Sequence, residues 1–263
     1  MRRTTLDRRS FLRRSVLGAS GLALGGCKVF DNATVQGSAM RAVFESASSL
    51  TYRTQRLLGG GHSLAREYTR ADILQSQHPN GSVLPDSESY QAMARNGFAN
   101  FELAVTGLVD SPLTLSRESL LAMPARTQIT RHDCVEGWSC IAEWTGVPLG
   151  QVLEQARPKP NARYVVFHCH DAIERSLAGP VYYYESIDMI DACHPQTILA
   201  YGLNGSPLPI ANGAPLRVRV ERQLGYKMAK YVHTIELVES FSDLGRGKGS
   251  YWADRGYEWY AGI

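Results

Sequence analysis

The most chemically active stretch of the sequence is Arg131-His132-Asp133-Cys134-Val135-Glu136-Gly137-Trp138-Ser139. It places a cysteine among ionisable side chains and follows it with Gly137, a residue that lets backbone approach closely. Such surroundings favour the thiolate form of Cys134, which is the form that binds a metal or attacks a substrate. Composition alone leaves two structural alternatives open: Cys134 is a small buried residue, or it forms a disulfide with Cys140.

This stretch and the one that follows it resemble the molybdenum-ligand segment of the sulfite-oxidase family. The matching residues are Cys134-Val135-Glu136-Gly137-Trp138-Ser139, followed by Glu143-Trp144-Thr145-Gly146-Val147-Pro148-Leu149. Further matching blocks lie at 194–197, 203–205, 208–209, 212–217 and 225–227, with Lys230 as the last position. The resemblance covers residues 95–240 and looks closest to the branch that holds the catalytic subunit of the periplasmic protein-methionine-sulfoxide reductase.

The fold that this resemblance implies is α+β: a sulfite-oxidase-type molybdopterin-binding domain with mixed β-sheets, irregular connections and short helices. Residue patterns support the same class. They predict strands at 102–109, 164–167, 216–220 and 231–238, and a short helix at 149–155. The run 216–220 alternates apolar and charged residues, so we expect a strand with one face in solvent. The sequence has no G-x-G-x-x-G or P-loop motif, so a nucleotide cofactor has no support.

The chain is expected to consist of four segments. Residues 1–27 are an export signal, 28–94 a linker with a helix and long loops, 95–240 the catalytic molybdopterin-binding domain, and 241–263 an aromatic segment packed on that domain. Apolar residues within 42–58 predict the helix, which the glycines at 59–61 end. Residues 66–95 are polar and turn-rich, and loops of such length inside a domain are usually functional.

The N-terminus has the pattern of a twin-arginine export signal. Asp7-Arg8-Arg9-Ser10-Phe11-Leu12-Arg13 precedes an apolar run at 16–24, which is far shorter than the roughly 20 residues of a membrane-spanning helix. We therefore expect a periplasmic protein that crosses the membrane already folded. Leu24-Gly25-Gly26-Cys27 resembles a lipoprotein cleavage site, so Cys27 is either acylated as a membrane anchor or removed with the signal.

The distribution of charge argues against a polyanionic partner. The formal charge of the chain is +3, but residues 1–27 hold six arginines and one aspartate and so carry +5. The remainder is near −2 and has no dense basic patch, so we expect no nucleic-acid binding. We expect the protein to be a monomer.

In the sulfite-oxidase family, molybdenum is held by the two dithiolene sulfurs of one molybdopterin and by one cysteine thiolate. The resemblance assigns this ligand to Cys134, and soft sulfur donors suit such a metal. One Mo-molybdopterin is expected per chain. Arg217 and Lys230 occupy the positions that hold the pterin phosphate, although a solvated strand face is the alternative for Arg217. The other residues that the resemblance places at the pterin are Asn96, Cys169, Asn212, Met228 and Ala229.

Two further residues are assigned to the substrate side of the metal. Arg95-Asn96-Gly97 resembles an Arg-Asn-His element of the family and so assigns Arg95, for which a plain surface arginine is the alternative. The resemblance also selects Tyr183, whose phenol is able to donate a hydrogen bond or a proton. Its alternative is aromatic core packing. Glu185 is either a proton relay or an acid satisfied by its neighbours.

One departure from the family bears on the substrate. Sulfite oxidases have arginines just after the ligand cysteine, whereas this chain has Glu136 and Trp138. A carboxylate repels a dianion. We therefore expect a redox enzyme that reduces an S-oxide or N-oxide such as methionine sulfoxide, small or protein-bound. The chain has no Cys-x-x-Cys-His motif, so electrons are exchanged with a separate partner, a membrane haem protein or a cytochrome.

Three other functions stay compatible with the sequence. The chain is a sulfite-oxidase-like enzyme that oxidises a small sulfur compound, or an exported lipoprotein or scaffold that keeps the fold without the chemistry. The third is a zinc hydrolase built on His168 and His170, which face the same side of a regular strand.

Overall fold

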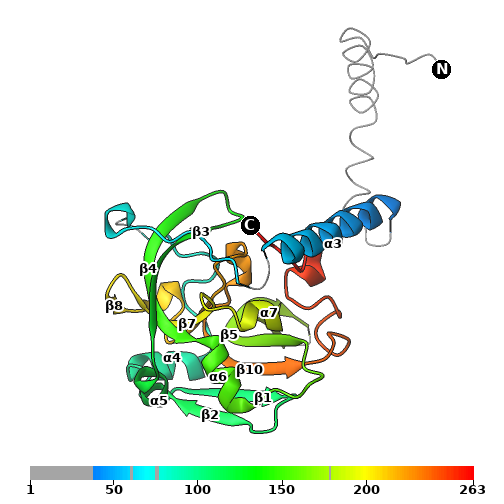
Figure 1. The fold of residues 1–263 in the computed structure, drawn as a ribbon. Coiled ribbons are helices and arrows are strands. Elements are labelled where there is room, and N and C mark those ends of the chain that lie inside the picture. Colours follow the sequence, from blue (N-terminus) through cyan, green and yellow to red (C-terminus); the bar gives the residue numbers. More distant parts are fainter. Residues whose placement is uncertain (1–37, 60–61, 75–76, 178) are drawn as a thin grey trace, which may run out of the picture. The chain divides into compact units, whose positions relative to one another are not determined.

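The computed structural model describes residues 38–59, 62–74, 77–177 and 179–263 (Figure 1). The chain divides into two compact units, residues 1–51 and 52–263. Helix α3 (Ala39–Gly59) crosses the boundary between these units and ends at the first glycine of the expected stop. The predicted export signal and Cys27 lie outside the described residues. Within the described ranges, no helix is long and apolar enough to span a membrane.

The first sheet is mixed, as predicted, and its strands follow the order β2-β1-β10-β5-β6. The bounds are β1 (Glu102–Gly107), β2 (Leu113–Ser116), β5 (Tyr164–Ser176), β6 (Gly179–Asp188) and β10 (Val232–Val238). Strands β1 and β10 are parallel, and the other neighbours are antiparallel. Because β10 lies at the centre, residues near the end of the chain are adjacent to residues from its middle.

Strand β5 is irregular in its second half. Its register against β6 shifts between His168 and Ala172 and again between Ala172 and Glu174. Such irregularities re-aim side chains relative to a regular strand. Burial nevertheless alternates from His168 to Ala172, with Cys169 and Asp171 buried and His170 half-buried.

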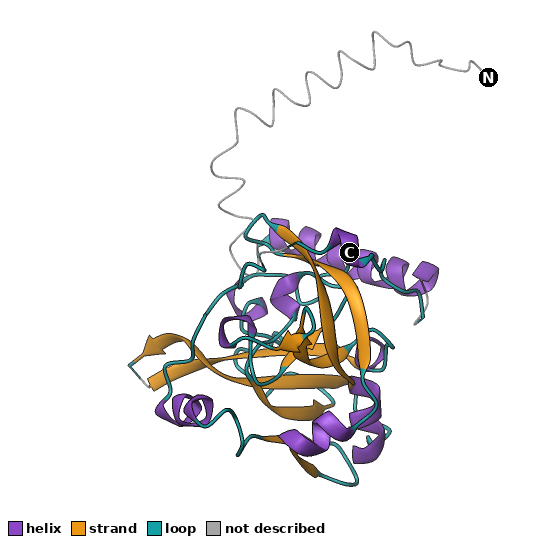
Figure 2. Cartoon of the chain, turned by 90° about the vertical axis from the view of Figure 1, so that its left-hand side faces the viewer, coloured by secondary structure: helices purple, strands orange, loops and turns teal. Residues whose placement is uncertain are grey.

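The second sheet is antiparallel and has the order β3-β4-β7-β8, with β9 paired to β7. Its strands are β3 (Arg126–Asp133), β4 (Ser139–Pro148), β7 (Ile198–Leu203), β8 (Ser206–Pro207) and β9 (Arg217–Arg219). Figure 2 shows the long strands of both sheets in orange, with short helices around them. Strands β3 and β4 form a hairpin, and residues 134–138 are its turn.

The helices after α3 are short, as predicted for this fold. They are α4 (Glu88–Arg95), α5 (Arg117–Ala122), α6 (Leu149–Ala156) and α7 (Met189–Ala192), with 3₁₀ turns η1 (Arg70–Asp72), η2 (Ile210–Asn212), η3 (Gly225–Lys227) and η4 (Ala253–Arg255). Helix α6 matches the predicted helix at 149–155. Helix α4 was not expected within the polar region 66–95. It begins after Ser87, whose hydroxyl accepts the N–H of Tyr90, and it buries only Tyr90, so it shows no apolar periodicity.

Strand β9 corrects the prediction of a half-solvated strand at 216–220. Arg217 and Arg219 are 2% and 0% exposed. Their guanidinium carbons lie 5.0 and 4.3 Å from the centre of the Trp144 ring, so both cations are near one aromatic face. The charged positions of this strand therefore point into the protein, and the solvated-face alternative for Arg217 is wrong.

The aromatic C-terminal segment packs against β5 and β6. Trp259 donates its Nε1–H to the Ser186 hydroxyl at 2.8 Å, and its ring lies edge-on to Tyr164 at 5.4 Å between centroids. Tyr251 is buried, with its ring 5.8 Å from that of Tyr183. The segment therefore shields parts of the first sheet and reaches the neighbourhood of Tyr183.

Candidate active site

Cys134 occupies the first position of the tight turn between β3 and β4. Its N–H donates to the Trp138 carbonyl at 2.9 Å, and its own carbonyl accepts the Gly137 N–H at 3.1 Å. Gly137 has φ +89°, a left-handed conformation that glycine adopts without the steric cost of a Cβ. The turn therefore holds the cysteine at the end of a rigid hairpin.

All four cysteines of the described part of the chain are free thiols: Cys134, Cys140, Cys169 and Cys193. The disulfide between Cys134 and Cys140 that the composition allowed is thus absent. Burial raises the pKa of the Cys134 thiol, and the charge of Arg217 only partly opposes this. The expectation that the surroundings by themselves favour the thiolate is wrong. A metal would have to displace the proton, as thiolate ligation generally requires.

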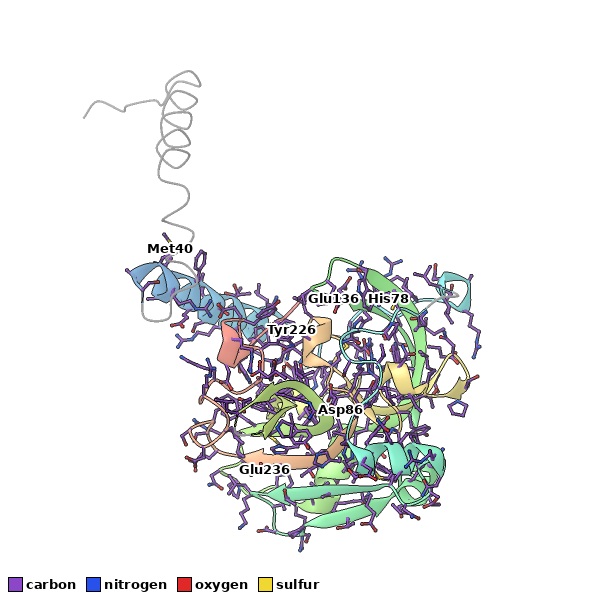
Figure 3. All side chains as sticks on the ribbon, turned by 180° about the vertical axis from the view of Figure 1, so that it is seen from behind. Met40, His78, Asp86, Glu136, Tyr226 and Glu236 are labelled. Carbon is purple, nitrogen blue, oxygen red and sulfur yellow. The ribbon has the colours of Figure 1, made fainter. Side chains whose placement is uncertain are left out.

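Cys134 lines a cavity of about 210 Å³. In Figure 3, Glu136 and Tyr226 lie at this part of the molecule, with His78 beside them. The walls come from five separate parts of the chain, namely 80–82, 134–136, strands β5 and β6, residues 226–230 and the C-terminal segment. The lining residues include Asn80, Ser82, Cys134, Glu136, Asp171, Tyr183, Met228, Lys230, Trp252 and Tyr257.

A second, much smaller cavity of about 10 Å³ adjoins the first through Asn80, which lines both. Asn212 and Arg217 line this small cavity, together with His132, Cys140 and Trp144. The four residues expected around the pterin are therefore divided, with Cys134 and Lys230 on the large cavity and Asn212 and Arg217 on the small one.

Arg217 is a buried cation whose hydrogen bonds go only to backbone carbonyls. It donates to Asn212 O at 2.9 Å and to Met228 O at 3.3 Å, while its Nε–H has no partner among the described residues. Burial and the charge of Arg219 lower its pKa to about 9. A buried charge without a counter-charge is costly, so an anion close to this guanidinium would stabilise the protein.

Lys230, on the larger cavity, is likewise a buried cation that donates to backbone carbonyls. Its ammonium donates to the backbone carbonyls of Ser82 and Ala211, the latter at 2.9 Å. Burial and the charge of Arg217 lower the pKa of Lys230 to about 7. Two partly uncompensated cations thus stand in adjoining walls.

Unsatisfied polar atoms gather around these two cavities. Seven buried side-chain N or O atoms of the described residues lack a hydrogen-bond partner. Five of them belong to cavity-lining residues: Gln77, His132, Trp144, Asp171 and Arg217. Since native proteins leave few buried polar groups unpaired, this concentration indicates that water or a polar ligand occupies the cavities.

The remaining expected pterin contacts are distributed unevenly. Met228 lines the large cavity, with its sulfur 3.3 Å from His132 Nδ1. Ala229 is buried, and its carbonyl accepts the Val218 N–H at 2.8 Å. Cys169 is 1% exposed and lines a different, open cavity of about 800 Å³. Of these three, only Met228 faces the cavity of Cys134.

Arg95 and Asn96 lie apart from this site. They form the C-terminal end of α4, and both are exposed. Neither lines the two adjoining cavities. The structure therefore brings neither residue to Cys134.

Tyr183 does line the cavity of Cys134, but its hydroxyl is already engaged. It donates to the Tyr226 carbonyl and lies 3.4 Å from Glu185 Oε2. Glu185 in turn forms a completely buried ion pair with Lys227 and accepts the Ser186 N–H at 2.8 Å. Burial raises the pKa of Tyr183 well above its ordinary value. Glu185 is thus an acid satisfied by its neighbours.

Several lining residues were not expected from the sequence. Asn80 and Ser82 come from the loop region 66–95, which its length marked as functional without identifying any residue. Trp252 and Tyr257 belong to the aromatic C-terminal segment, for which packing alone was expected. Asp171 follows the histidines for which zinc binding was considered.

The zinc site on His168 and His170 is wrong. His168 pairs with Glu236 at 2.8 Å, whereas the ring of His170 packs 4.4 Å from that of His233. Both histidines line the same open cavity of about 800 Å³, but they engage different partners. Among the described residues, no three His, Cys, Asp or Glu side chains form a group that could hold a metal ion.

The fold is that of a molybdopterin-binding oxidoreductase. The family model described as "oxidoreductase molybdopterin binding domain" matches residues 90–244, which is more than half of the chain. The protein belongs to this family and is an enzyme of the oxidoreductase class.

Its relatives include proteins named as sulfoxide reductase subunits. A putative protein-methionine-sulfoxide reductase subunit, YedZ1 of Azospira oryzae, is 36% identical over 97% of this chain and 87% of its own. A protein-methionine-sulfoxide reductase catalytic subunit, MsrP of Xanthomonas campestris, is 40% identical over 70% of this chain and 59% of its own. A solved structure, the sulfane dehydrogenase SoxCD from Paracoccus pantotrophus, matches 54% of this chain and 39% of its own at 23% identity, with a TM-score of 0.47.

Proposed function

We propose that the protein is a catalytic subunit that reduces sulfoxides, with a molybdenum–molybdopterin cofactor whose metal is bound by Cys134. The observation that supports this most strongly is the arrangement around the two cavities. A free, partly exposed thiol faces a space with Lys230 in its wall, and the adjoining cavity holds the unpaired guanidinium of Arg217. A ligand that combines a soft metal, a polar heterocycle and a phosphate suits this set of residues.

Each part of the cofactor has residues of matching chemistry. Cys134 would supply the protein's sulfur ligand to the metal, with one cofactor per chain. Arg217 and Lys230 would hold the phosphate, since both are buried and neither has a carboxylate partner among the described residues. Asn212 and Met228 would contact the pterin from the small and large cavities. When bound, the group supplies two electrons and accepts or donates an oxygen atom.

The cavity of Cys134 favours a neutral sulfoxide over sulfite. Glu136 stands at the mouth, where its carboxylate accepts the Trp138 Nε1–H at 3.0 Å. A negative charge fixed there repels a sulfite dianion. Ile173, Trp252 and Tyr257 add apolar walls that suit the carbon substituents of a thioether. Because Val135 and Tyr257 are 47% and 40% exposed, the mouth is open enough for a sulfoxide on a protein surface.

The reaction requires partners outside this chain. A sulfoxide, two electrons and two protons give a thioether and water. We assign the electrons to a separate membrane haem protein or cytochrome, and this assignment is supported by relatives that are named as subunits. The twin-arginine pattern supports a periplasmic location. We assign the protein as a monomer. Acylation of Cys27 would attach it to the membrane.

The proposal is tested by producing the full chain in a host that makes the cofactor. We expect near-stoichiometric molybdenum and reduction of methionine sulfoxide with an artificial electron donor, with much slower turnover of sulfite. Cys134→Ser should lose most of the metal and the activity, while Cys193→Ser, which removes a thiol outside both cavities, serves as a control. The proposal would be overturned if the wild-type protein contained no molybdenum. It would also be overturned if the protein had no redox activity and Cys134→Ser left its partner binding unchanged, as expected of a scaffold.

A further inference from the structure

Asp171 lines the cavity of Cys134, and one of its two carboxylate oxygens is unpaired. The residue is 4% exposed and lies in the irregular part of β5. Its Oδ2 accepts the Ser82 hydroxyl at 2.7 Å. Its Oδ1 has no hydrogen-bond partner among the described residues, although it is completely shielded. An unpaired buried carboxylate oxygen is costly when charged, so burial opposes ionisation of this carboxyl.

Two other proton-bearing groups of the cavity, on Tyr183 and Lys230, are already engaged. Tyr183 donates its only O–H proton to the Tyr226 carbonyl. Lys230 donates two of its protons to backbone carbonyls. Asp171 therefore lines the cavity with a carboxyl group of which one oxygen has no partner among the described residues.

The charges around Asp171 act in opposite directions. Burial raises the pKa of Asp171, and the Ser82 hydrogen bond and the Lys230 ammonium lower it less strongly. Tyr90, Tyr231, Tyr183 and Cys169 also lie within electrostatic range, and all of them are neutral at pH 7 because burial raises each pKa. Lys230 is the one nearby cation of the described residues that acts on this carboxyl.

We propose that Asp171, rather than Tyr183, is the proton donor for oxygen-atom removal in this cavity. The inference rests on the proposed sulfoxide reduction. In that reaction the S–O bond breaks, the sulfur keeps its two carbon substituents, and the oxygen leaves as water. The reduced cofactor provides the two electrons. In this proposal Asp171 provides one of the two protons from its carboxyl group and regains it from solvent, which also provides the second proton.

The test uses the molybdenum-loaded full chain and Asp171→Asn, which keeps the shape and the acceptor for Ser82. Molybdenum content should stay near wild type, and the KM for methionine sulfoxide should change little. The value of kcat should fall by about 100-fold or more, which is the usual contribution of a general acid. Asp171→Glu should restore part of the loss. The matched control is Glu174→Gln on the same strand, which pairs with Arg255 outside the cavity and should stay within a few-fold of wild type.

A second readout does not depend on turnover. At a pH above the ordinary pKa of an aspartate, the wild-type protein should show the infrared band of a protonated carboxyl group. This band should be absent from Asp171→Asn. Activity that needs the protonated acid is lost as the pH rises through the pKa of Asp171. Ser82→Ala removes a hydrogen bond that lowers this pKa, so the decline should move to higher pH.

The possible failures are distinguishable. If the loaded wild-type protein reduces no sulfoxide, the proposed function fails. If it reduces sulfoxides and Asp171→Asn does so equally well, only the assignment of Asp171 fails. Loss of molybdenum from a folded Asp171→Asn protein would also overturn the assignment, because the residue would then serve cofactor binding.

Discussion

Two arginines of the same short strand are buried against the same Trp144 ring, and only one of them has a counter-charge. Arg219 forms a two-pronged pair with Glu221, at 2.9 Å from Nε and 2.7 Å from NH2, and its third nitrogen lies 2.8 Å from His132 Nδ1. Arg217 contacts only backbone carbonyls and leaves its Nε–H unpaired.

The difference separates charge that serves the fold from charge that serves a ligand. The Arg219–Glu221 pair is electrically complete, so it needs nothing from outside the protein. Arg217 is incomplete in the same surroundings, and it lines a cavity that adjoins the one of Cys134. A buried cation without a counter-charge is therefore better evidence for a cofactor site than the burial of a cation alone.

The largest effect is expected from removing the counter-charge of Arg219. Glu221→Gln would leave a second uncompensated guanidinium beside Trp144, and breaking a buried pair in this way costs about 3–5 kcal/mol of unfolding free energy. Urea denaturation of the protein without cofactor measures the loss. The double variant Arg219→Met with Glu221→Gln should recover much of it, because no buried charge is then left alone. If Glu221→Gln alone were as stable as wild type, Arg219 would not depend on its counter-charge, and the proposed difference between the two arginines would be wrong.

The opposite result is expected for Arg217→Met. Without cofactor this variant should lose less than about 2 kcal/mol, because two hydrogen bonds of about 1 kcal/mol each are lost while an uncompensated charge is removed. Cofactor binding should weaken by roughly 10- to 100-fold, since a charge-assisted contact to phosphate contributes about 1.5–3 kcal/mol. Molybdenum content under limiting cofactor is the measurement, and full loading would contradict the assignment.

Sequence patterns were sufficient where local rules decide the structure. The helix at 149–156 follows from apolar residues at helical spacing, and the strands at 102–107 and 232–238 from alternation. The family resemblance correctly indicated a mixed-sheet molybdopterin-binding fold. It also singled out Cys134, which the structure places in the hairpin turn at the cavity.

Local rules failed where partners come from distant parts of the chain. Alternation at 216–220 suggested solvent on one face, but Trp144 and Glu221 replace that solvent, and neither contact is visible in the pattern of the strand. The ionisable neighbours of Cys134 suggested a thiolate, whereas burial raises its pKa. Asn80 and Trp252 come from a loop and the C-terminal segment that meet at the cavity only in the folded chain.

The smallest effect concerns the second cation, Lys230, and the pH dependence of stability. Its pKa is lowered to about 7, mainly by burial and then by the charge of Arg217, compared with about 10.4 in an unfolded chain. Between these values the unfolded chain binds more protons, so the stability of the protein without cofactor should rise with pH. One group contributes at most about 1.4 kcal/mol per pH unit.

Lys230→Met should remove this slope between about pH 7 and 8, measured by urea denaturation at each pH. Above that range the buried cysteines and tyrosines, whose pKa values are raised, act in the opposite direction in both proteins, so the difference between wild type and variant isolates Lys230. A bound phosphate group stabilises the protonated amine, so the slope should also flatten in the cofactor-loaded protein. Equal slopes in wild type and Lys230→Met would mean that Lys230 is already compensated, and it would then resemble Arg219 rather than Arg217.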